Sequence, residues 1–368
     1  PIFVFDRIIE FSNESIIKKI FIGLSLFLIS IFSYYVVERP SRNNKCKFRY
    51  IFSTIFILYS IIFILNSNVI KNNGFKDRFP KFLDIREKEV LRDPVSFIRC
   101  NGDEPGIEKT CYFNKSSDKK VFLVGDSHNY NLMPDLKRKL VNNNYQFITL
   151  IYNGCFHFPK FYQINTKTKK INSYCNIDSQ YKILSQANNS TIIFFGRLPL
   201  YLNKVYFDNE EGGKERDIWD SLFVSTEKNL TIEETFRTEV KKLAQNNKII
   251  LIYPFPEAGR DIPKKILSLS NSENKNIKEY LIPKNYITTS HEVYKKRTES
   301  SFELLNSIEG KNIIRIFPDK LFCNTVIKDR CLTHDNEYIF YADDDHPSSR
   351  AGEMINEQIM QEMSKLFN

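Results

Sequence analysis

Two segments near opposite ends of the chain carry the residue types of a serine-based acyl-transfer site. Ser127 lies in the segment Gly125–His128 directly after the apolar run Val121–Val124, and Asp343 precedes His346 by three positions. A serine hydroxyl becomes a nucleophile when a base removes its proton. A carboxylate on the second ring nitrogen of a histidine fixes the tautomer that can act as this base. The sequence therefore predicts a catalytic group of Ser127, His346 and Asp343.

The residues around Ser127 have the pattern of a strand, a turn and a helix. The apolar run at 121–124 predicts a buried strand, Gly125 and Asp126 predict the turn, and residues 128–141 predict a helix. Such a turn places the hydroxyl at the carboxyl end of a strand, beside a helix N-terminus that favours a developing anion. The alternative is a capped turn without chemistry, and the rest of the chain decides between the two.

The other histidines have less informative surroundings. We expect His128 to pack around the turn or to contact substrate, with its ring directed away from the serine. We expect structural or surface positions for His157, His291 and His334, because none has a partner at metal-ligand spacing. The acidic run before His346 could instead bind calcium, but three consecutive aspartates supply too few oxygen ligands. The sequence predicts no metal site.

Strand-like and helix-like patterns alternate from residue 120 onward. Strands are expected at 121–124, 146–152, 191–195, 248–253 and 312–316, and helices at 128–141, 232–245, 290–307 and 351–366. This alternation predicts an α/β fold with a mainly parallel sheet and helices on both faces. Ligands of such sheets lie at the carboxyl ends of the strands, where we expect Ser127. Residues 263–283 break the alternation and predict a surface excursion.

The N-terminal residues have the pattern of a membrane domain. Residues 20–37 carry no charge and residues 51–70 are similarly apolar, so both approach the roughly 20 residues that cross a bilayer. The segment between them carries five basic residues, which by the positive-inside rule places it in the cytoplasm and the rest of the chain on the far side. We expect a membrane domain at 1–70, a linker or extension at 71–119 that packs on the next domain, and that domain at 120–368. The chain begins at Pro1 without a signal-peptide pattern, and we interpret it as part of a longer protein.

Cysteine usage agrees with this orientation. Cys46 lies alone in the basic segment, whereas the other six cysteines all follow the apolar segments. An even number on that side indicates disulfides in an oxidising compartment. Short loops favour pairing of nearest neighbours. The predicted pairs are Cys100–Cys111, Cys155–Cys175 and Cys323–Cys331.

The charge of the chain leaves several partner classes open. A formal net charge of +9 could serve nucleic acid, an anionic membrane or an acidic glycan. The sequence contains nothing similar to a zinc finger, an RNA-binding sheet motif or a basic helix with interleaved aromatics. We therefore expect no nucleic-acid partner, and lysines scattered over the surface explain most of the charge.

These motifs, in this order, resemble a known bacterial family. Gly125–His128 and Asp343-x-x-His346 resemble the first and last blocks of the SGNH (GDSL-like) hydrolase superfamily. Tyr34–Pro40, which reads Tyr-Tyr-x-Val-Glu-Arg-Pro, resembles the end of the acyltransferase-3 membrane domain. The combination is similar to bacterial acyltransferase-3 proteins with a C-terminal SGNH domain, which O-acetylate surface polysaccharides such as lipopolysaccharide O-antigen.

The resemblance implies a fold, a location and a reaction. The fold would be a three-layer, flavodoxin-like parallel sheet preceded by two transmembrane helices in the bacterial inner membrane, with residues 71–368 in the periplasm. The chain would be an O-acyltransferase with Ser127 as its nucleophile, and its acceptor would be a polysaccharide or a lipid-linked glycan. It would bind no cofactor itself, and acetyl-CoA would be the acyl source through a membrane portion absent from this chain.

The resemblance also suggests oxyanion donors. Gly154, just after the second predicted strand, matches the glycine of the superfamily's middle blocks, but the Gly-x-Asn-Asp block is missing. Backbone donors at Ser127 and Gly154 would each contribute about 3 kcal/mol to transition-state stabilisation. A third donor could be Arg197, which follows the third predicted strand, or Asn153. Arg197 could equally be an ordinary surface cation.

Two other functions remain open. With water in place of the sugar hydroxyl, the same residues would form a carbohydrate esterase or deacetylase. Without any chemistry, the domain would be a glycan-binding module that positions polysaccharide for a membrane acyltransferase. Fusion to a membrane acyl carrier favours transfer over hydrolysis, because a transferase needs such a donor and an esterase gains little from it.

Overall fold

The computed structural model describes residues 16–39, 48–72, 110–155, 160–171, 175, 177–215, 220–227, 229–272, 284 and 286–365. By its internal contacts the chain divides into two units. We call residues 1–84 and 267–277 the helical unit, and residues 85–266 and 278–368 the sheet unit.

The helical unit contains two long helices. These are α2 (Ile16–Ser33), which continues into the π-helical segment η1 (Tyr34–Glu38), and α4 (Phe48–Lys71). Large apolar side chains are exposed along both helices. Within the described parts of the chain, we find no helix whose length and apolar character together suffice to cross a membrane.

The two predicted membrane spans are therefore not found, although both segments are helical. The basic segment that was expected between the helices, with Cys46, lies largely outside the described residues.

The sheet unit is built on a six-stranded sheet in the order β1-β3-β2-β5-β7-β9. The strands are β1 (Thr110–Phe113), β2 (Lys120–Gly125), β3 (Gln146–Ile151), β5 (Thr191–Phe195), β7 (Lys248–Ile252) and β9 (Ile313–Ile316). The last five run parallel, as predicted, in the flavodoxin-like order of the doubly wound folds. The sheet is nevertheless mixed, because β1 pairs with β3 in the antiparallel sense. This edge strand comes from the polar stretch 71–119, whose pattern gives no strand signal.

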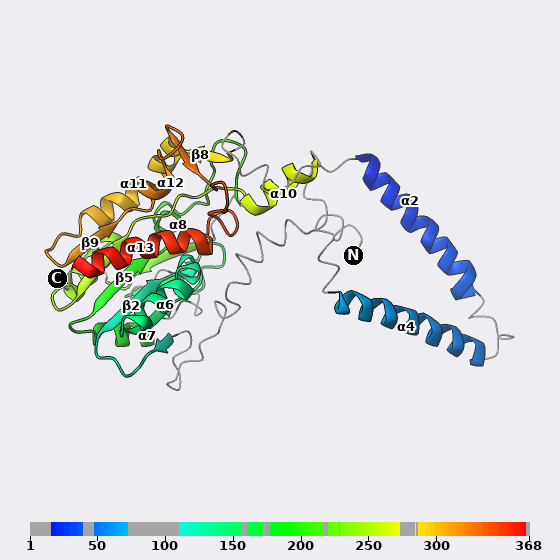
Figure 1. The fold of residues 1–368 in the computed structure, drawn as a ribbon, viewed down its shortest axis with the longest axis horizontal. Coiled ribbons are helices and arrows are strands. Elements are labelled where there is room, and N and C mark those ends of the chain that lie inside the picture. The colour runs from blue at the N-terminus through cyan, green and yellow to red at the C-terminus, as the bar shows by residue number, and fades with distance from the viewer. Residues whose placement is uncertain are drawn as a thin grey trace. The chain divides into compact units, whose positions relative to one another are not determined.

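Helices cover both faces of this sheet (Figure 1). On one face, Phe122, Val124 and Phe194 belong to a buried cluster that also includes residues of α8 (Leu198–Asn203), α9 (Ile232–Leu243) and α11 (His291–Asn306). Neighbouring residues of a strand point to opposite faces. The face that carries Val121 and Leu123 is equally buried, under α6 (Met133–Asn142) and α13 (Ser349–Lys365). The predicted α/β architecture with helices on both faces is confirmed.

Three of the four predicted helices form with shifts of a few residues at their ends, and the fourth is divided. Residues 128–141 were expected to form one helix, but the chain forms the 3₁₀ helix η4 (Ser127–Asn131) and then α6. Pro134 lies in the first turn of α6 and lacks the N–H that a continuous helix would require. The start of α9 is set by a capping box between Thr231 and Glu234.

Several short elements carry too little periodicity to be predicted. They are α7 (Asp178–Ser185), α8, α12 (Asp319–Phe322), and two two-stranded sheets formed by β4 (Phe161–Asn165) with β6 (Ser221–Ser225) and by β8 (Thr288–Ser290) with β10 (Arg330–Leu332). The expected surface excursion at 263–283 begins as helix α10 (Ile262–Ser272). The part of it at 273–283 lies outside the described residues.

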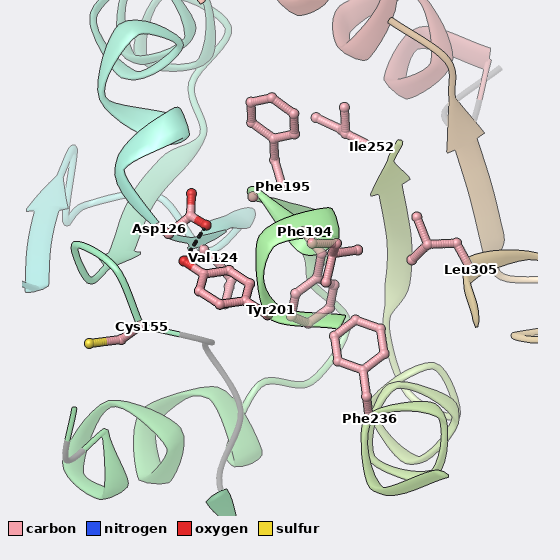
Figure 2. A pocket seen from close by; sticks show the side chains of 12 residues that line it. Val124, Asp126, Cys155, Phe194, Phe195, Tyr201, Phe236, Ile252 and Leu305 are labelled. Atoms are coloured by element: carbon pink, nitrogen blue, oxygen red, sulfur yellow. Dashed lines mark hydrogen bonds between the residues drawn. The ribbon is translucent and has the colours of Figure 1, made fainter. Parts of the chain in front are cut away.

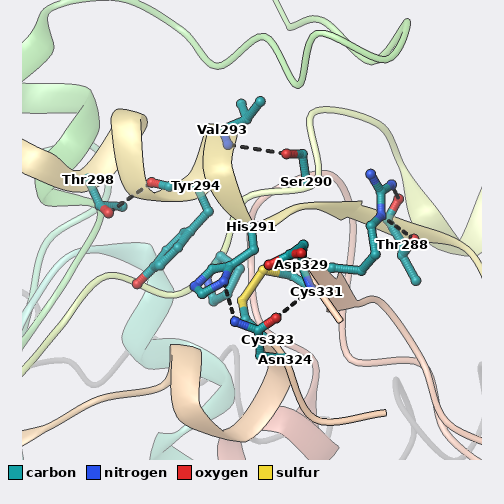
Figure 3. The surroundings of a disulfide bond; sticks show 12 residues. Thr288, Ser290, His291, Val293, Tyr294, Thr298, Cys323, Asn324, Asp329 and Cys331 are labelled. Atoms are coloured by element: carbon teal, nitrogen blue, oxygen red, sulfur yellow. Dashed lines mark hydrogen bonds between the residues drawn. A yellow bond between two sulfur atoms is a disulfide. The ribbon is translucent and has the colours of Figure 1, made fainter. Parts of the chain in front are cut away.

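Two of the three predicted disulfides are present. Cys155 is joined to Cys175, and Cys323 to Cys331. The second bond links α12 to β10 beside His291, whose Nδ1 lies 2.7 Å from Asn324 Nδ2 (Figure 3). Cys111 is also disulfide-bonded, while its predicted partner Cys100 lies outside the described residues.

We expect both disulfides to stabilise the sheet unit, and the one with the longer loop to contribute more. Replacing Cys155 and Cys175 together by alanine should lower the free energy of unfolding by about 3 kcal/mol, and replacing Cys323 and Cys331 by about 2.5 kcal/mol, because each crosslink restricts the unfolded chain. Urea unfolding of the variants without reductant measures both values. A Cys46→Ser variant provides the control, and midpoints equal to the parent in both double variants would contradict the expectation.

Candidate active site

The structure brings the three predicted catalytic side chains together. His346 Nε2 lies 2.8 Å from Ser127 Oγ, although 219 positions separate the two residues in the sequence. The other ring nitrogen, Nδ1, lies 2.9 Å from Asp343 Oδ2. The imidazole thus connects a hydroxyl to a carboxylate, which is the arrangement that lets a histidine accept a serine proton.

A sharp turn after β2 presents Ser127. Gly125 has φ of +154°, and a Cβ added there would lie 1.7 Å from the carbonyl oxygen of Phe195. Any residue other than glycine would therefore separate β2 from β5 at the point where they approach each other. This close approach determines where along β2 the chain leaves the sheet and enters the turn that carries Ser127.

Asp126 connects this turn by hydrogen bonds to residues that follow the neighbouring strand β5. Its carboxylate accepts hydrogen bonds from the backbone N–H groups of His128, at 3.1 Å, and Arg197, at 2.8 Å. It also accepts one from the Tyr201 hydroxyl at 2.7 Å, which Figure 2 shows directed at it. Asp126 thus joins the turns after β2 and β5, between which the strand order reverses. Ligands of doubly wound sheets bind at this switch point.

The apolar pocket behind the turn is separate from the reacting groups. It is lined by Asp126, Tyr201 and core residues such as Phe194 and Phe236 (Figure 2), and neither Ser127 nor His346 belongs to its lining. The hydroxyl and the imidazole lie instead at the carboxyl end of the sheet, where the side chain of His346 is 27% exposed.

A tight loop before α13 positions His346. Asp343 Oδ1 accepts the backbone N–H groups of Asp345, at 3.1 Å, and His346, at 2.9 Å. The backbone N–H of Ala342 donates to the carbonyl of His346 at 3.0 Å. These bonds bend the chain so that the Asp343 carboxylate reaches the ring three residues later. The three-residue spacing is therefore a geometric requirement of this loop.

The electrostatics of the site favour a protonated imidazole. Burial lowers the pKa of His346, but its hydrogen bonds to Asp343 and Asp345 outweigh this effect and raise the pKa to about 10. Burial raises the pKa of Asp343, yet the contact with His346 leaves it below its usual value. The carboxylates would thus stabilise the imidazolium that a proton from Ser127 would create.

Asp345 was not singled out by the sequence pattern but contacts the same ring. Its Oδ1 lies 3.0 Å from His346 Nδ1, and its Oδ2 lies 3.0 Å from both His128 Nε2 and Arg197 Nη1. The ring of His128 is directed at this carboxylate, so His128 has a polar partner in addition to its packing. The run of three aspartates before His346 was the available signal.

Arg197 is neither a surface cation nor a free donor. It is 9% exposed, and its guanidinium forms ion pairs with Glu215, Glu257 and Asp345. Glu257 is shared with Arg297, whose Nε lies 2.7 Å from Glu257 Oε2. The guanidinium donors are directed at carboxylates, so the structure does not support the expected role of Arg197 as an oxyanion donor.

Residues 99–361 match the family model of the SGNH domain that is fused to AT3 domains. The chain belongs to this family. Several solved structures are similar to the chain, three of which are described next, and no curated protein matches the chain significantly.

The first of these structures is the periplasmic domain of a lipopolysaccharide acetyltransferase from Salmonella ser. Paratyphi A, with 17% identity, a TM-score of 0.43, and coverage of 68% of this chain and 85% of that chain. The second is a possible lipase from Chitinophaga pinensis, with 12% identity, a TM-score of 0.33, and coverage of 67% and 98%. The third is the acetyl xylan esterase AlAXEase, with 16% identity, a TM-score of 0.31, and coverage of 66% and 98%.

In this SGNH domain, Asn153 and Gly154 lie in the turn after β3. The backbone N–H of Tyr152 donates to the carbonyl of Gly125 at 2.9 Å, which brings this turn beside the one that carries Ser127. Gly154 has a positive φ of +63°, and the next residue, Cys155, is held by its disulfide to Cys175. Their role as oxyanion donors stays a prediction.

The remaining histidines of the SGNH domain have structural surroundings where they are described. His334 is fully buried, and its Nε2 accepts the backbone N–H of Ile287 at 3.0 Å. His291 contacts Asn324 next to the Cys323–Cys331 disulfide. Both match the expectation, and His157 lies outside the described residues.

Proposed function

We propose that this SGNH domain transfers an acyl group, acetyl in the first instance, to a hydroxyl of a cell-surface polysaccharide such as lipopolysaccharide O-antigen. The observation that carries the proposal is the 2.8 Å separation of Ser127 Oγ and His346 Nε2, with Asp343 on the opposite ring nitrogen. The fusion of the family to AT3 domains supports transfer over hydrolysis, because an attached acyl-transfer domain can supply the donor.

In the first half of the reaction, His346 Nε2 takes the proton of Ser127 while Oγ attacks the carbonyl carbon of the acyl donor. The resulting oxyanion would be held by the backbone N–H groups of Ser127 and Gly154. The tetrahedral species collapses when the bond to the leaving group breaks, and His346 returns its proton to that group. Ser127 then carries the acyl group as an ester.

In the second half, a sugar hydroxyl replaces the leaving group. His346 removes the hydroxyl proton as the sugar oxygen attacks the ester carbon of acyl-Ser127, and the bond to Oγ then breaks. Oγ recovers its proton from His346, and the acetylated glycan leaves. Asp343 keeps the same ring nitrogen directed at the reacting oxygen in both halves.

The disulfides support a location for this chemistry outside the cytoplasm. Such bonds persist in oxidising compartments, and the sheet unit holds Cys155–Cys175 and Cys323–Cys331. We propose the periplasm, where a polysaccharide or lipid-linked glycan acceptor is accessible. Acetyl-CoA would be the acyl source, used by the AT3 domain and not bound by the SGNH domain.

A partition experiment tests transfer against hydrolysis. The protein is incubated with p-nitrophenyl acetate, with and without O-antigen oligosaccharide, and both acetate release and acetylated glycan are quantified by mass spectrometry. We expect the glycan to divert acetyl groups from water, because it competes for the same acyl-Ser127. Acetate release that no concentration of glycan reduces would instead indicate an esterase.

A further inference from the structure

His346 has two carboxylate partners on a single ring nitrogen. Asp343 Oδ2 lies 2.9 Å and Asp345 Oδ1 lies 3.0 Å from Nδ1. This nitrogen carries one hydrogen, so two acceptors share one donor. The side chain of Asp343 is 40% exposed, whereas that of Asp345 is 6% exposed. Solvent screens the buried carboxylate less, so its charge acts more strongly on the ring.

Asp345 is itself held from its other side. His128 Nε2 and Arg197 Nη1 both lie 3.0 Å from Oδ2. His128 Nδ1 is buried and has no hydrogen-bond partner among the described residues. A ring lone pair is less costly to leave unpaired than an N–H, and a carboxylate can only accept, so the hydrogen of His128 belongs on Nε2, where it donates to Asp345.

The charged and titratable groups around His346 come from five segments of the sheet unit. The loop before α13 contributes the three aspartates 343–345, η4 contributes His128, and the turn after β5 contributes Arg197. Glu215 and Glu257 lie behind Arg197 and pair with its guanidinium. The nearby Arg197 charge disfavours a metal cation between His128, Asp345 and His346, so hydrogen bonds account for this cluster.

We propose that Asp345, fixed by His128 and Arg197, is a positioning residue that holds the ring of His346 and shares its Nδ1 hydrogen with Asp343. The inference rests on the proposed function in that it takes His346 to be the base for Ser127. Each carboxylate alone can keep the ring in its working tautomer. Loss of either one should therefore weaken the reaction less than loss of both.

The titration of His346 tests this inference without requiring chemistry. In a Ser127→Ala background with ¹⁵N-labelled histidine, we expect Asp345→Asn to lower the pKa of His346 by about 1 unit or more, as loss of a close opposite charge does. Asp343→Asn should lower it as well, and the double variant further. Because this readout needs no substrate, it can succeed even if the acyl-transfer proposal fails.

The pH profile of ester hydrolysis is the second readout. His346 must be neutral to accept the proton of Ser127, so the rate rises with pH through the pKa of His346. Asp345→Asn should therefore shift the acid limb of kcat/KM to lower pH, in the same direction as the NMR titration. Asp118→Asn, at an exposed position before β2 and so at the opposite end of that strand from Ser127, should leave the limb in place.

Two results would overturn the inference. One is a folded Asp345→Asn protein, checked by circular dichroism, in which the pKa of His346 is unchanged. If Asp345→Asn does not fold, Asp343→Asn decides: we expect it to keep a raised pKa for His346 and measurable activity through Asp345. An ordinary histidine pKa for His346 in Asp343→Asn would show that Asp345 does not interact appreciably with the ring.

Discussion

Ser127→Ala should lower the rate of acyl transfer by about 10⁴-fold or more, because removal of a serine nucleophile leaves only the binding and oxyanion contributions. The hydroxyl has one partner in the reacting group, His346 Nε2 at 2.8 Å, so its loss should change neither the sheet nor the ion pairs behind it. Transfer from p-nitrophenyl acetate to oligosaccharide measures the rate, and acetylation of polysaccharide in cells carrying the variant measures the consequence.

Ser116→Ala is the matched control for this substitution. Ser116 is exposed, and its hydroxyl donates to Asn114 in the turn after β1, so the variant should retain full activity. A glycan-binding module would keep full acetylation with alanine at position 127. Retained acetylation in folded Ser127→Ala protein would therefore exclude the transferase and favour the binding function.

Arg197→Met should destabilise the sheet unit by about 3–5 kcal/mol, because it leaves buried carboxylates without their shared cation. Arg197 pairs with Glu215, Glu257 and Asp345, all of whose side chains are at most 6% exposed. Arg297 remains beside Glu257 but contacts neither of the other two within the described ion pairs. Chemical unfolding of the variant and the parent measures the difference.

The control is Arg330→Met, which breaks a more exposed pair with Glu211. The two side chains of that pair are 28% and 36% exposed, and such pairs contribute at most about 1 kcal/mol. Similar losses in both variants would mean that the buried cluster is not the reason for the effect of Arg197.

The loss of stability in Arg197→Met should also depend on pH, and the protonation of Glu215 determines whether it grows or shrinks as pH rises. Burial raises the pKa of Glu215 from 4.5 to about 7, against the opposing effect of Arg197. A carboxyl whose pKa is raised on folding contributes stability that is complete below its unfolded pKa and is lost as pH rises through the folded value. Without Arg197 this pKa rises further, so the variant should be most destabilised at about pH 8 and partly recover at about pH 5.

The sequence predicted which three side chains meet at the candidate site better than it predicted their surroundings. Ser127, Asp343 and His346 belong to local patterns, a strand followed by a Gly-Asp-Ser turn and an Asp-x-x-His loop, whose geometry depends on neighbours in the chain. The parallel strands could be predicted equally well, because their apolar runs are continuous. Both the local motifs and the apolar runs can be recognised in the sequence without knowledge of the tertiary fold.

Features that depend on contacts between distant residues could not be predicted. The burial of Arg197 arises from Glu215 and Glu257, which lie 18 and 60 positions away, and nothing in the residues beside it marks an ion pair. Strand β1 is only four residues long and forms because β3 offers an open edge. The apolar stretches at 20–37 and 51–70 gave the correct secondary structure, although neither described helix is long and apolar enough to cross a membrane.

The reacting groups stand at a partly open edge, with Asp343 40% and His346 27% exposed, and they do not line the apolar pocket behind the turn. For the glycan acceptor that we propose, the partial exposure of these side chains requires no free chain end, so internal units should approach as readily as the terminus. Acetyl groups should consequently be distributed along the polymer, and partial digestion of the product would reveal substituted units throughout its length.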